Sequence, residues 1–219
     1  MSVLRILVVD DHEVARKGIR ALLEGHPGWE VCGEGRDGRE AVDLAAKMKP
    51  DVVLLDIGMP NLNGLNAARQ ILATNPQTRI LVLTMHDSNQ VVREVLAAGA
   101  RGFLLKSDAG RDLVAAVEAL QQHRTYFTTK VAQMVLSGYL HPSTDRANEP
   151  AEQDVLTPRE REVIQLLAEG KTTKEVAVAL NLSVKTAETH RTNLMRKLDL
   201  HSVADLTLYA VRNGIVQVY

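Results

Sequence analysis

The chain has 219 residues, with 45% hydrophobic and 24% charged residues and a net charge of −1, which is ordinary for a folded globular protein. This length predicts one large domain or two small ones, each able to bury a core. No apolar run approaches the length of a membrane span and the N-terminus lacks a signal-peptide pattern, so we expect a cytoplasmic protein with no membrane partner. The single cysteine, Cys32, excludes an intrachain disulfide, and an aromatic content of 3% disfavours binding of nucleic acid by base stacking.

The first half of the chain alternates short apolar runs with helical patterns. The runs cover residues 3–9, 52–55, 80–83 and 103–105, and a weaker run at 29–34 is typical of an edge strand. Near-continuous apolar runs of this length favour strands that are buried on both faces, as in a parallel sheet. Five strand–helix repeats therefore predict a doubly wound α/β domain with a five-stranded parallel sheet over residues 1–123.

The second half begins with a polar stretch and is then purely helical. Residues 141–153 (HPSTDRANEPAEQ) have the composition of a linker, and we assign residues 124–153 to a linker with a helix at 128–140. Thr157, Thr172 and Ser183 are helix start signals, and Gly214 is a stop signal. Four short helices over residues 154–219 predict a small all-α helix-turn-helix domain.

Polar residues follow four of the predicted strands at the point where each strand ends. Asp10 and Asp11 end the first run, and Asp56, Thr84 and Lys106 end three others. Ligands of doubly wound sheets bind at this edge. Three carboxylates favour a hard cation such as Mg²⁺, and a carboxylate can also attack phosphorus to form an acyl phosphate. A lysine and a hydroxyl would then neutralise and bind the transferred group.

Residues 1–123 resemble the receiver domain of bacterial two-component response regulators, on the matching text VVDDHEVAR, LLDIGMPNLNG, LTMHD and GARGFLLKS. The resemblance implies a flavodoxin-like strand order 2-1-3-4-5. It implies that Asp56 accepts the phosphoryl group, that Lys106 binds it, and that Thr84 and Phe103 form the switch pair. It assigns Mg²⁺ to four oxygen donors: Asp10, Asp11, Asp56 and the main-chain carbonyl of Gly58.

Other interpretations of the acidic edge remain open. His12 is conceivable as a transition-metal ligand, although a solvated first-turn residue is the commoner case beside oxygen donors. An aspartate-nucleophile phosphatase or phosphotransferase would use the same groups, but no second acid stands two residues after Asp56. A receiver that no longer accepts phosphate is a third interpretation, and the intact polar set argues against it.

Residues 171–198 predict a helix, a tight turn and a second, polar helix. The spacing of Lys185, Glu188, Thr189 and Thr192 places them close to one face, which fits the DNA major groove or, alternatively, a solvated surface. Residues 154–219 resemble the LuxR-type helix-turn-helix domain of the NarL/FixJ group, on the text LTPREREVIQLLAEGKTTKEVAVALNLSVKTAETHRTNLMRKLDLHS. The resemblance implies that residues 184–198 form the recognition helix.

Two sets of DNA contacts follow from this resemblance. Candidates for reading bases are Glu188, Thr189 and Thr192. Candidates for contacting phosphates are Lys185, Thr186, His190, Arg191, Arg196 and Lys197. His190 could equally make a hydrogen bond between helices.

The last predicted helix, 203–213, is the dimerisation element that the resemblance implies, through Leu206, Tyr209 and Ala210, although these residues could equally close the small core. The two domains together predict a regulator of transcription that is not an enzyme and catalyses only its own aspartyl phosphorylation and dephosphorylation. We expect a histidine kinase to phosphorylate Asp56, after which the chain dimerises and binds double-stranded DNA at a pseudo-palindromic promoter site.

Overall fold

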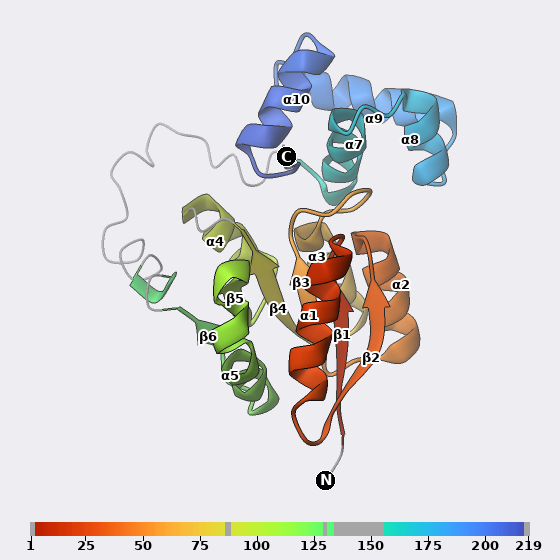
Figure 1. Cartoon of the computed structure of the whole chain (residues 1–219). Coiled ribbons are helices and arrows are strands. Elements are labelled where there is room, and N and C mark those ends of the chain that lie inside the picture. Colours follow the sequence, from red (N-terminus) through yellow and green to blue (C-terminus); the bar gives the residue numbers. More distant parts are fainter. Residues whose placement is uncertain (1–2, 86–88, 129–130, 134–155, 217–219) are drawn as a thin grey trace. The chain divides into compact units, whose positions relative to one another are not determined.

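The computed structural model of the chain describes residues 3–85, 89–128, 131–133 and 156–216. The chain folds into two compact units, Met1–Ser137 and Gly138–Tyr219 (Figure 1). The division falls inside the predicted linker 124–153. Among the described residues, no helix combines the length and the apolar character that crossing a membrane requires.

The first unit is built on one parallel sheet in the order β2-β1-β3-β4-β5-β6. Its strands are β1 (Leu4–Val9), β2 (Trp29–Gly35), β3 (Val52–Asp56), β4 (Arg79–Thr84), β5 (Gly102–Leu105) and β6 (Tyr126–Phe127). The predicted order of the first five strands is confirmed, with the weak run at β2 on one edge. The short strand β6 was not predicted, because two residues are too few to show a period. It forms where the chain returns to the sheet and the Tyr126 amide donates to the Arg101 carbonyl at 3.0 Å.

Helices cover both faces of this sheet. They are α1 (Glu13–Glu24), α2 (Gly38–Met48), α3 (Gly64–Thr74), α4 (Asn89–Ala97) and α5 (Ala109–Gln121), with a short 3₁₀ helix η1 (Lys106–Asp108) before α5. Leu7 and Val9 of β1 pack with residues of α2, α3 and α4. Ile6 and Val8 pack with residues of α1 and α5 on the other face. Alternate strand residues thus enter two cores, which explains the near-continuous apolar runs.

Within residues 156–216, the second unit has four helices, as predicted: α7 (Pro158–Ala168), α8 (Thr173–Ala179), α9 (Val184–Lys197) and α10 (Val203–Arg212). Thr157 and Thr172 each form a capping box with a glutamate three residues later. Ser183 caps α9 by accepting from the Thr186 amide. The apolar faces of the four helices meet in one small core.

The predicted helix at 128–140 is described only in part. Residues 131–133 are helical, and Val131 is buried against the first unit's core. Residues 129–130 and 134–155, which include the remainder of that helix and the polar linker, lie outside the described residues.

Candidate functional site

The carboxyl ends of the strands bring the predicted acids together. Asp56 is the last residue of β3, and Asp10 and Asp11 follow β1. One donor atom from each of Asp10, Asp11, His12 and Asp56 lies within 4.8 Å of the others. Asp10 and Asp56 are buried and Asp11 is partly exposed, so the cluster reaches from the buried strand ends to the solvent. Such crowded carboxylates repel one another, and a cation relieves that repulsion.

Lys106 supplies a cation within the chain. It directly follows β5, the strand next to β4, and its Nζ lies 2.8 Å from Asp56 Oδ2 and 2.8 Å from Asp10 Oδ2. Burial raises the pKa of Asp56 above its usual value, and the charge of Lys106 opposes that rise. Burial also pulls the pKa of Lys106 down, but the two carboxylates outweigh it and the net pKa is raised. Lys106 therefore stays protonated beside Asp56.

Thr84 and Phe103 lie on the two strands that lead to this edge. Asp56 is the register partner of Leu83, so Thr84 stands one residue beyond it at the end of β4. Thr84 has no exposed surface, and Phe103 in β5 is 1% exposed and packs in the core that α2, α3 and α4 cover. Phe103 is therefore an inward-facing residue in this structure.

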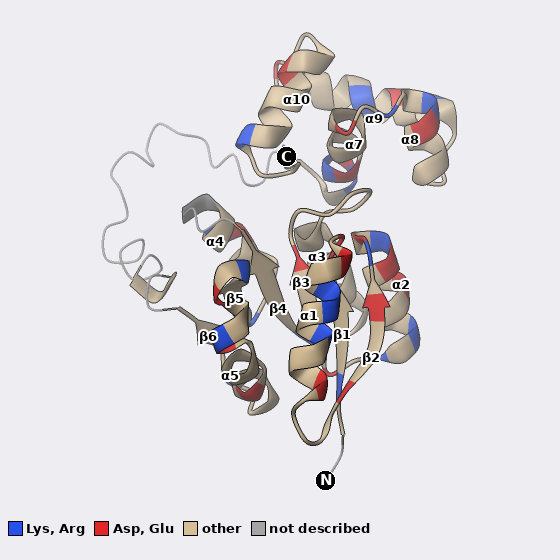
Figure 2. Ribbon diagram, in the orientation of Figure 1, with Lys and Arg blue, Asp and Glu red and all other residues tan. Residues whose placement is uncertain are grey.

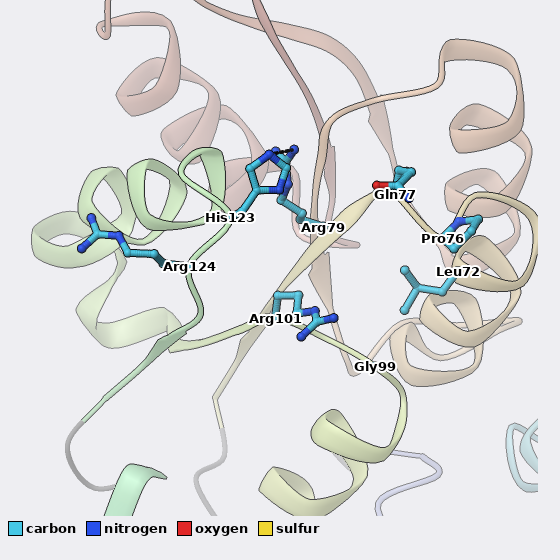
Figure 3. Close-up of a pocket in the computed structure, with 9 residues that line it drawn as sticks. Leu72, Pro76, Gln77, Arg79, Gly99, Arg101, His123 and Arg124 are labelled. Atoms are coloured by element: carbon cyan, nitrogen blue, oxygen red, sulfur yellow. Dashed lines mark hydrogen bonds between the residues drawn. The ribbon is translucent and has the colours of Figure 1, made fainter.

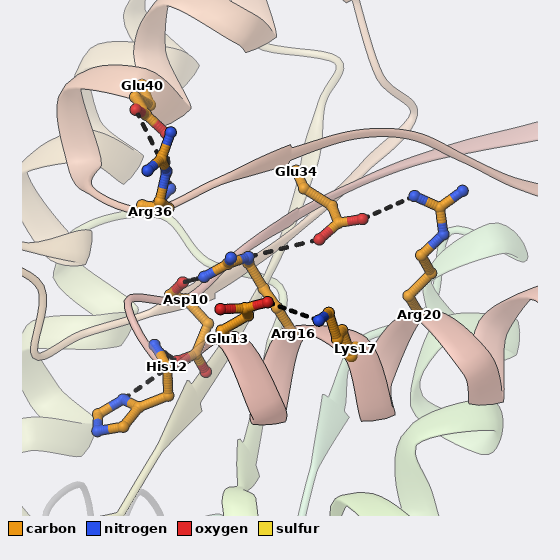
Figure 4. A network of polar contacts seen from close by, with 9 residues as sticks. All are labelled: Asp10, His12, Glu13, Arg16, Lys17, Arg20, Glu34, Arg36 and Glu40. Atoms are coloured by element: carbon orange, nitrogen blue, oxygen red, sulfur yellow. Dashed lines mark hydrogen bonds and ion pairs between the residues drawn. The ribbon is translucent and has the colours of Figure 1, made fainter.

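A network of charges holds the loop that carries Asp10 (Figure 4). The buried Arg16 of α1 donates from Nη1 to the main-chain carbonyl of Asp10 at 2.7 Å, and its Nε lies 3.4 Å from Glu34 Oε2. Arg20 pairs with the same glutamate at 2.7 Å. No role for Arg16 was predicted, although this residue closes the quoted text VVDDHEVAR and its spacing places it on the inner face of α1.

His12 lies beside the acids without being enclosed by them. Its main-chain amide donates to Asp10 Oδ1 at 2.9 Å, and its Nδ1 lies 2.7 Å from Asp11 Oδ1. The ring remains 54% exposed. The donor set is thus three carboxylates with one imidazole at the rim, which fits Mg²⁺ better than a transition metal.

The loop after Asp56 depends on a close approach that only glycine permits. The Gly64 amide, at the start of α3, donates to the Ile57 carbonyl at 2.9 Å. A Cβ at Gly64 would lie 1.9 Å from the Asp56 carbonyl oxygen. Gly58, whose carbonyl is a predicted metal ligand, is partly exposed within this loop. Gly64 was not among the predicted site residues, although it closes the quoted text LLDIGMPNLNG.

In the second unit, α9 presents an exposed polar face. Its exposed residues include most of the predicted DNA contacts: Lys185, Thr186, Glu188, Thr189, Thr192, Arg196 and Lys197. Ala187 and Leu194 point into the core on the opposite side. Basic and acidic residues occur together on the helices of this unit (Figure 2), so charge alone does not mark the face.

Three of the predicted phosphate contacts are partly buried or bound to a neighbouring helix. Arg191 is partly buried and donates from Nη1 to Thr173 Oγ1 of α8 at 3.2 Å. Lys197 donates from Nζ to Glu160 Oε2 of α7 at 3.0 Å. His190 is partly buried. These three side chains flank the exposed face, and two of them join α9 to its neighbouring helices.

Two of the three predicted dimerisation residues are placed wrongly for that role. Leu206 and Ala210 have no exposed surface, because α10 packs them against α7 in the core of the unit. Tyr209 is partly buried against the same core. The large apolar residues that α10 exposes are Val203 at 46% and Leu208 at 49%. A helix in a four-helix unit must bury one stripe, and that stripe contains Leu206 and Ala210.

Comparison with known proteins matches both units to characterised families. Residues 6–118 match the response regulator receiver domain, and residues 154–210 match the bacterial regulatory proteins of the luxR family. The chain is 39% identical over 213 residues to the transcriptional regulatory protein LiaR of Bacillus subtilis, covering 97% of this chain and 99% of that protein. It is 34% identical over 212 residues to the response regulator UvrY of Escherichia coli K12, covering 97% and 95%.

Solved structures give the same assignment. The RcsB response regulator of Salmonella typhimurium matches with a TM-score of 0.64 and 28% identity, covering 97% of this chain and 99% of that one. A complex of the response regulator RcsB with DNA matches with a TM-score of 0.59 and 28% identity, covering 96% and 98%. The chain therefore belongs to the two-component response regulators that join a receiver domain to a LuxR-type DNA-binding domain, and it is a phosphorylation-controlled regulator of transcription.

Proposed function

We propose that Asp56 is the phosphoryl acceptor and that a sensor histidine kinase is the donor. The observation that carries this proposal is the position of Lys106, whose Nζ lies 2.8 Å from both Asp56 and Asp10. An ammonium group at this distance binds an oxygen of a phosphoryl group that arrives at Asp56. The same group favours the ionised form of the buried Asp56 by opposing the rise of its pKa, and a nucleophilic carboxylate must be ionised.

In the transfer step, an oxygen of Asp56 forms a bond to phosphorus. The bond between phosphorus and the imidazole nitrogen of the kinase breaks, and the imidazole leaves with the electron pair and takes a proton from water. Lys106 neutralises the charge on the phosphoryl oxygens during this exchange. The buried floor around Asp10 and Asp56 strengthens that interaction, because electrostatic effects grow where water is excluded.

Mg²⁺ is the cation that we propose for the acidic cluster. Asp10, Asp11, Asp56 and the main-chain carbonyl of Gly58 would hold it, in part through water, and all four offer hard oxygen donors. When bound, the metal would supply positive charge next to the transferring phosphoryl group. Arg16 fixes the loop that presents two of these acids.

We further propose that phosphorylation acts through Thr84 and Phe103. Thr84 at the end of β4 would donate its hydroxyl hydrogen to a phosphoryl oxygen, and Phe103 would move with it. The face formed by α4 and α5 would change shape, and the chain would form a homodimer that binds a pseudo-palindromic promoter site. The exposed face of α9 would enter the major groove, with Glu188, Thr189 and Thr192 at base edges and Lys185 and Arg196 at phosphates.

Labelling with acetyl phosphate in the presence of Mg²⁺ tests the acceptor. The wild-type chain should gain one phosphoryl group per chain, measured by intact mass, and Asp56→Asn should gain none. Asp11→Asn should need more Mg²⁺ for the same labelling. Labelling of Asp56→Asn at the wild-type rate would exclude Asp56 as the acceptor. Repeated turnover of a small phosphate ester, in place of one stoichiometric acylation, would favour a phosphatase.

A further inference from the structure

The edge of the sheet opposite the acidic cluster carries a cavity of about 420 Å³. It lies at the amino ends of β4, β5 and β6, where the three connections that lead into these strands meet. The α3–β4 connection contributes Pro76 and Thr78, and Arg79 begins β4. The α4–β5 connection contributes Gly99 and Arg101. The α5–β6 connection contributes His123 and Arg124, as Figure 3 shows.

This cavity is strongly basic. Arg79, Arg101 and Arg124 line it, together with His123, and no aspartate or glutamate is among its lining residues. None of the three guanidinium groups forms an ion pair with a carboxylate of the described residues. Arg79 Nη2 lies 3.4 Å from His123 Nε2, and Arg124 donates to the amide oxygen of Gln122.

Two arginines of α1 differ from the arginines of the cavity, because each forms an ion pair with a carboxylate. Arg16 and Arg20 of the same unit both contact Glu34, so their charges are compensated inside the protein. The charges at the opposite edge have no such partner among the described residues. Like charges that share a cavity repel one another, and a bound anion relieves this repulsion in the way a cation does at the acidic edge.

The backbone around the cavity is fixed before any ligand arrives. The Arg101 amide donates to the Ile80 carbonyl at 2.9 Å, and the Arg101 carbonyl accepts from Tyr126, so both sides of Arg101 are tied to the sheet. Gly99 has a φ of +87°, and a Cβ there would lie 2.9 Å from Leu72. A site whose backbone is already ordered loses less entropy when it binds a ligand.

We propose that this cavity binds a nucleotide-sized small molecule that carries two or more phosphate groups. Guanidinium groups bind phosphate oxygens in a bidentate manner, and Arg79 and Arg101 would do so here. A volume of about 420 Å³ exceeds what one phosphate ion fills and falls within the roughly 300–1,000 Å³ of small-molecule sites. Leu72 and Pro76 offer an apolar wall for the organic part of the ligand.

Calorimetric titration of the full chain tests this proposal. The titrants are ADP, GDP, pyrophosphate, inorganic phosphate and citrate, each in a buffer with EDTA so that no metal links an anion to the acidic cluster. We expect ADP or GDP to bind more tightly than pyrophosphate, and both to bind more tightly than phosphate or citrate. Binding should weaken as salt concentration rises.

Three variants locate the binding. Arg101→Ala removes an exposed side chain and should lower the affinity about tenfold or more, as expected for a charge-assisted hydrogen bond. Arg79→Ala should have a similar effect. Arg36→Ala, an exposed arginine of the same unit outside the cavity, should leave the affinity unchanged. Unfolding temperatures without ligand show whether each variant is folded.

Several results would overturn the proposal. The first is no heat of binding for any phosphate compound, and the second is an equal loss of affinity in Arg36→Ala and Arg101→Ala. Citrate that binds as tightly as ADP would show a general anion site, and pyrophosphate that binds as tightly as ADP would exclude recognition of the organic part. Loss of acetyl phosphate labelling has no bearing here, so the test stands apart from that of Asp56.

Discussion

The guanidinium of Arg16 donates a hydrogen bond of 2.7 Å to the main-chain carbonyl of Asp10. This contact joins the first helix to the acidic loop, and Glu34 of β2 holds the other side of the guanidinium at 3.4 Å. The position of the predicted metal ligands thus depends on a residue that binds no metal.

Arg16→Ala should weaken Mg²⁺ binding several-fold, because the loop that carries Asp10 and Asp11 loses its anchor. The direction of the change in Mg²⁺ affinity is informative, because removal of a nearby positive charge would by itself strengthen cation binding. Calorimetric titration with Mg²⁺ measures the change. Arg20→Ala is the matched control, because Arg20 also contacts Glu34 but not the acidic loop, and it should leave Mg²⁺ affinity close to wild type. Equal effects in both variants would exclude the anchoring role.

Lys106→Gln should slow labelling of Asp56 and move its pH dependence. Burial raises the pKa of Asp56 and Lys106 opposes that rise, so loss of the ammonium raises this pKa further. The reactive carboxylate is lost as the pH falls through this pKa, so the acidic limb of the rate profile should move to higher pH. Lys17→Gln, an exposed lysine of α1, serves as the control. An acidic limb at the wild-type pH would contradict the assignment.

Gly64→Ala should destabilise the receiver unit and impair the phosphoryl site. The new Cβ would lie 1.9 Å from the Asp56 carbonyl oxygen, so the backbone must shift, at a cost of about 1–3 kcal/mol in the free energy of unfolding. Gly18→Ala in α1 is the matched control. It meets no atom within 4 Å, and alanine favours a helix over glycine by about 0.5–1 kcal/mol, so it should stabilise. Urea unfolding of both variants separates the two effects.

Lys185→Ala and Lys197→Ala should differ although both remove a lysine from α9. Lys185 is exposed, so its loss should lower affinity for all DNA sequences without changing stability. Lys197 pairs with Glu160 at 3.0 Å, so its loss should also cost up to about 1 kcal/mol in stability of the second unit. Binding measured at several salt concentrations, together with urea unfolding, distinguishes them.

Thr189→Ala should change the base preference of the protein, because Thr189 lies on the exposed face of α9 beside Lys185. Sequencing of DNA selected by the phosphorylated protein measures this preference. If the variant weakened every site equally, Thr189 would contact the backbone of DNA and not a base.

Local patterns in the sequence were sufficient to predict most helices and strands and the cluster of Asp10, Asp11 and Asp56. Apolar runs predicted five strands, and cap residues such as Thr157 and Thr172 predicted where helices begin, since both depend on neighbours within a few residues. Parallel strands end at one edge of a sheet, so the sequence also predicted that Asp10, Asp56 and Lys106 would meet.

Contacts between distant segments required the tertiary structure. Packing between distant segments leaves no periodic pattern in the sequence. It produces the close contact of Gly64 with Asp56, the hydrogen bond from Arg16 to Asp10 and the additional strand β6. The role of α10 also required the tertiary structure, because the sequence pattern of one apolar stripe is the same for a core helix and for a dimer surface. Both Leu206 and Ala210 are buried in the core of the second unit, and only the packing of α10 against the other helices shows this.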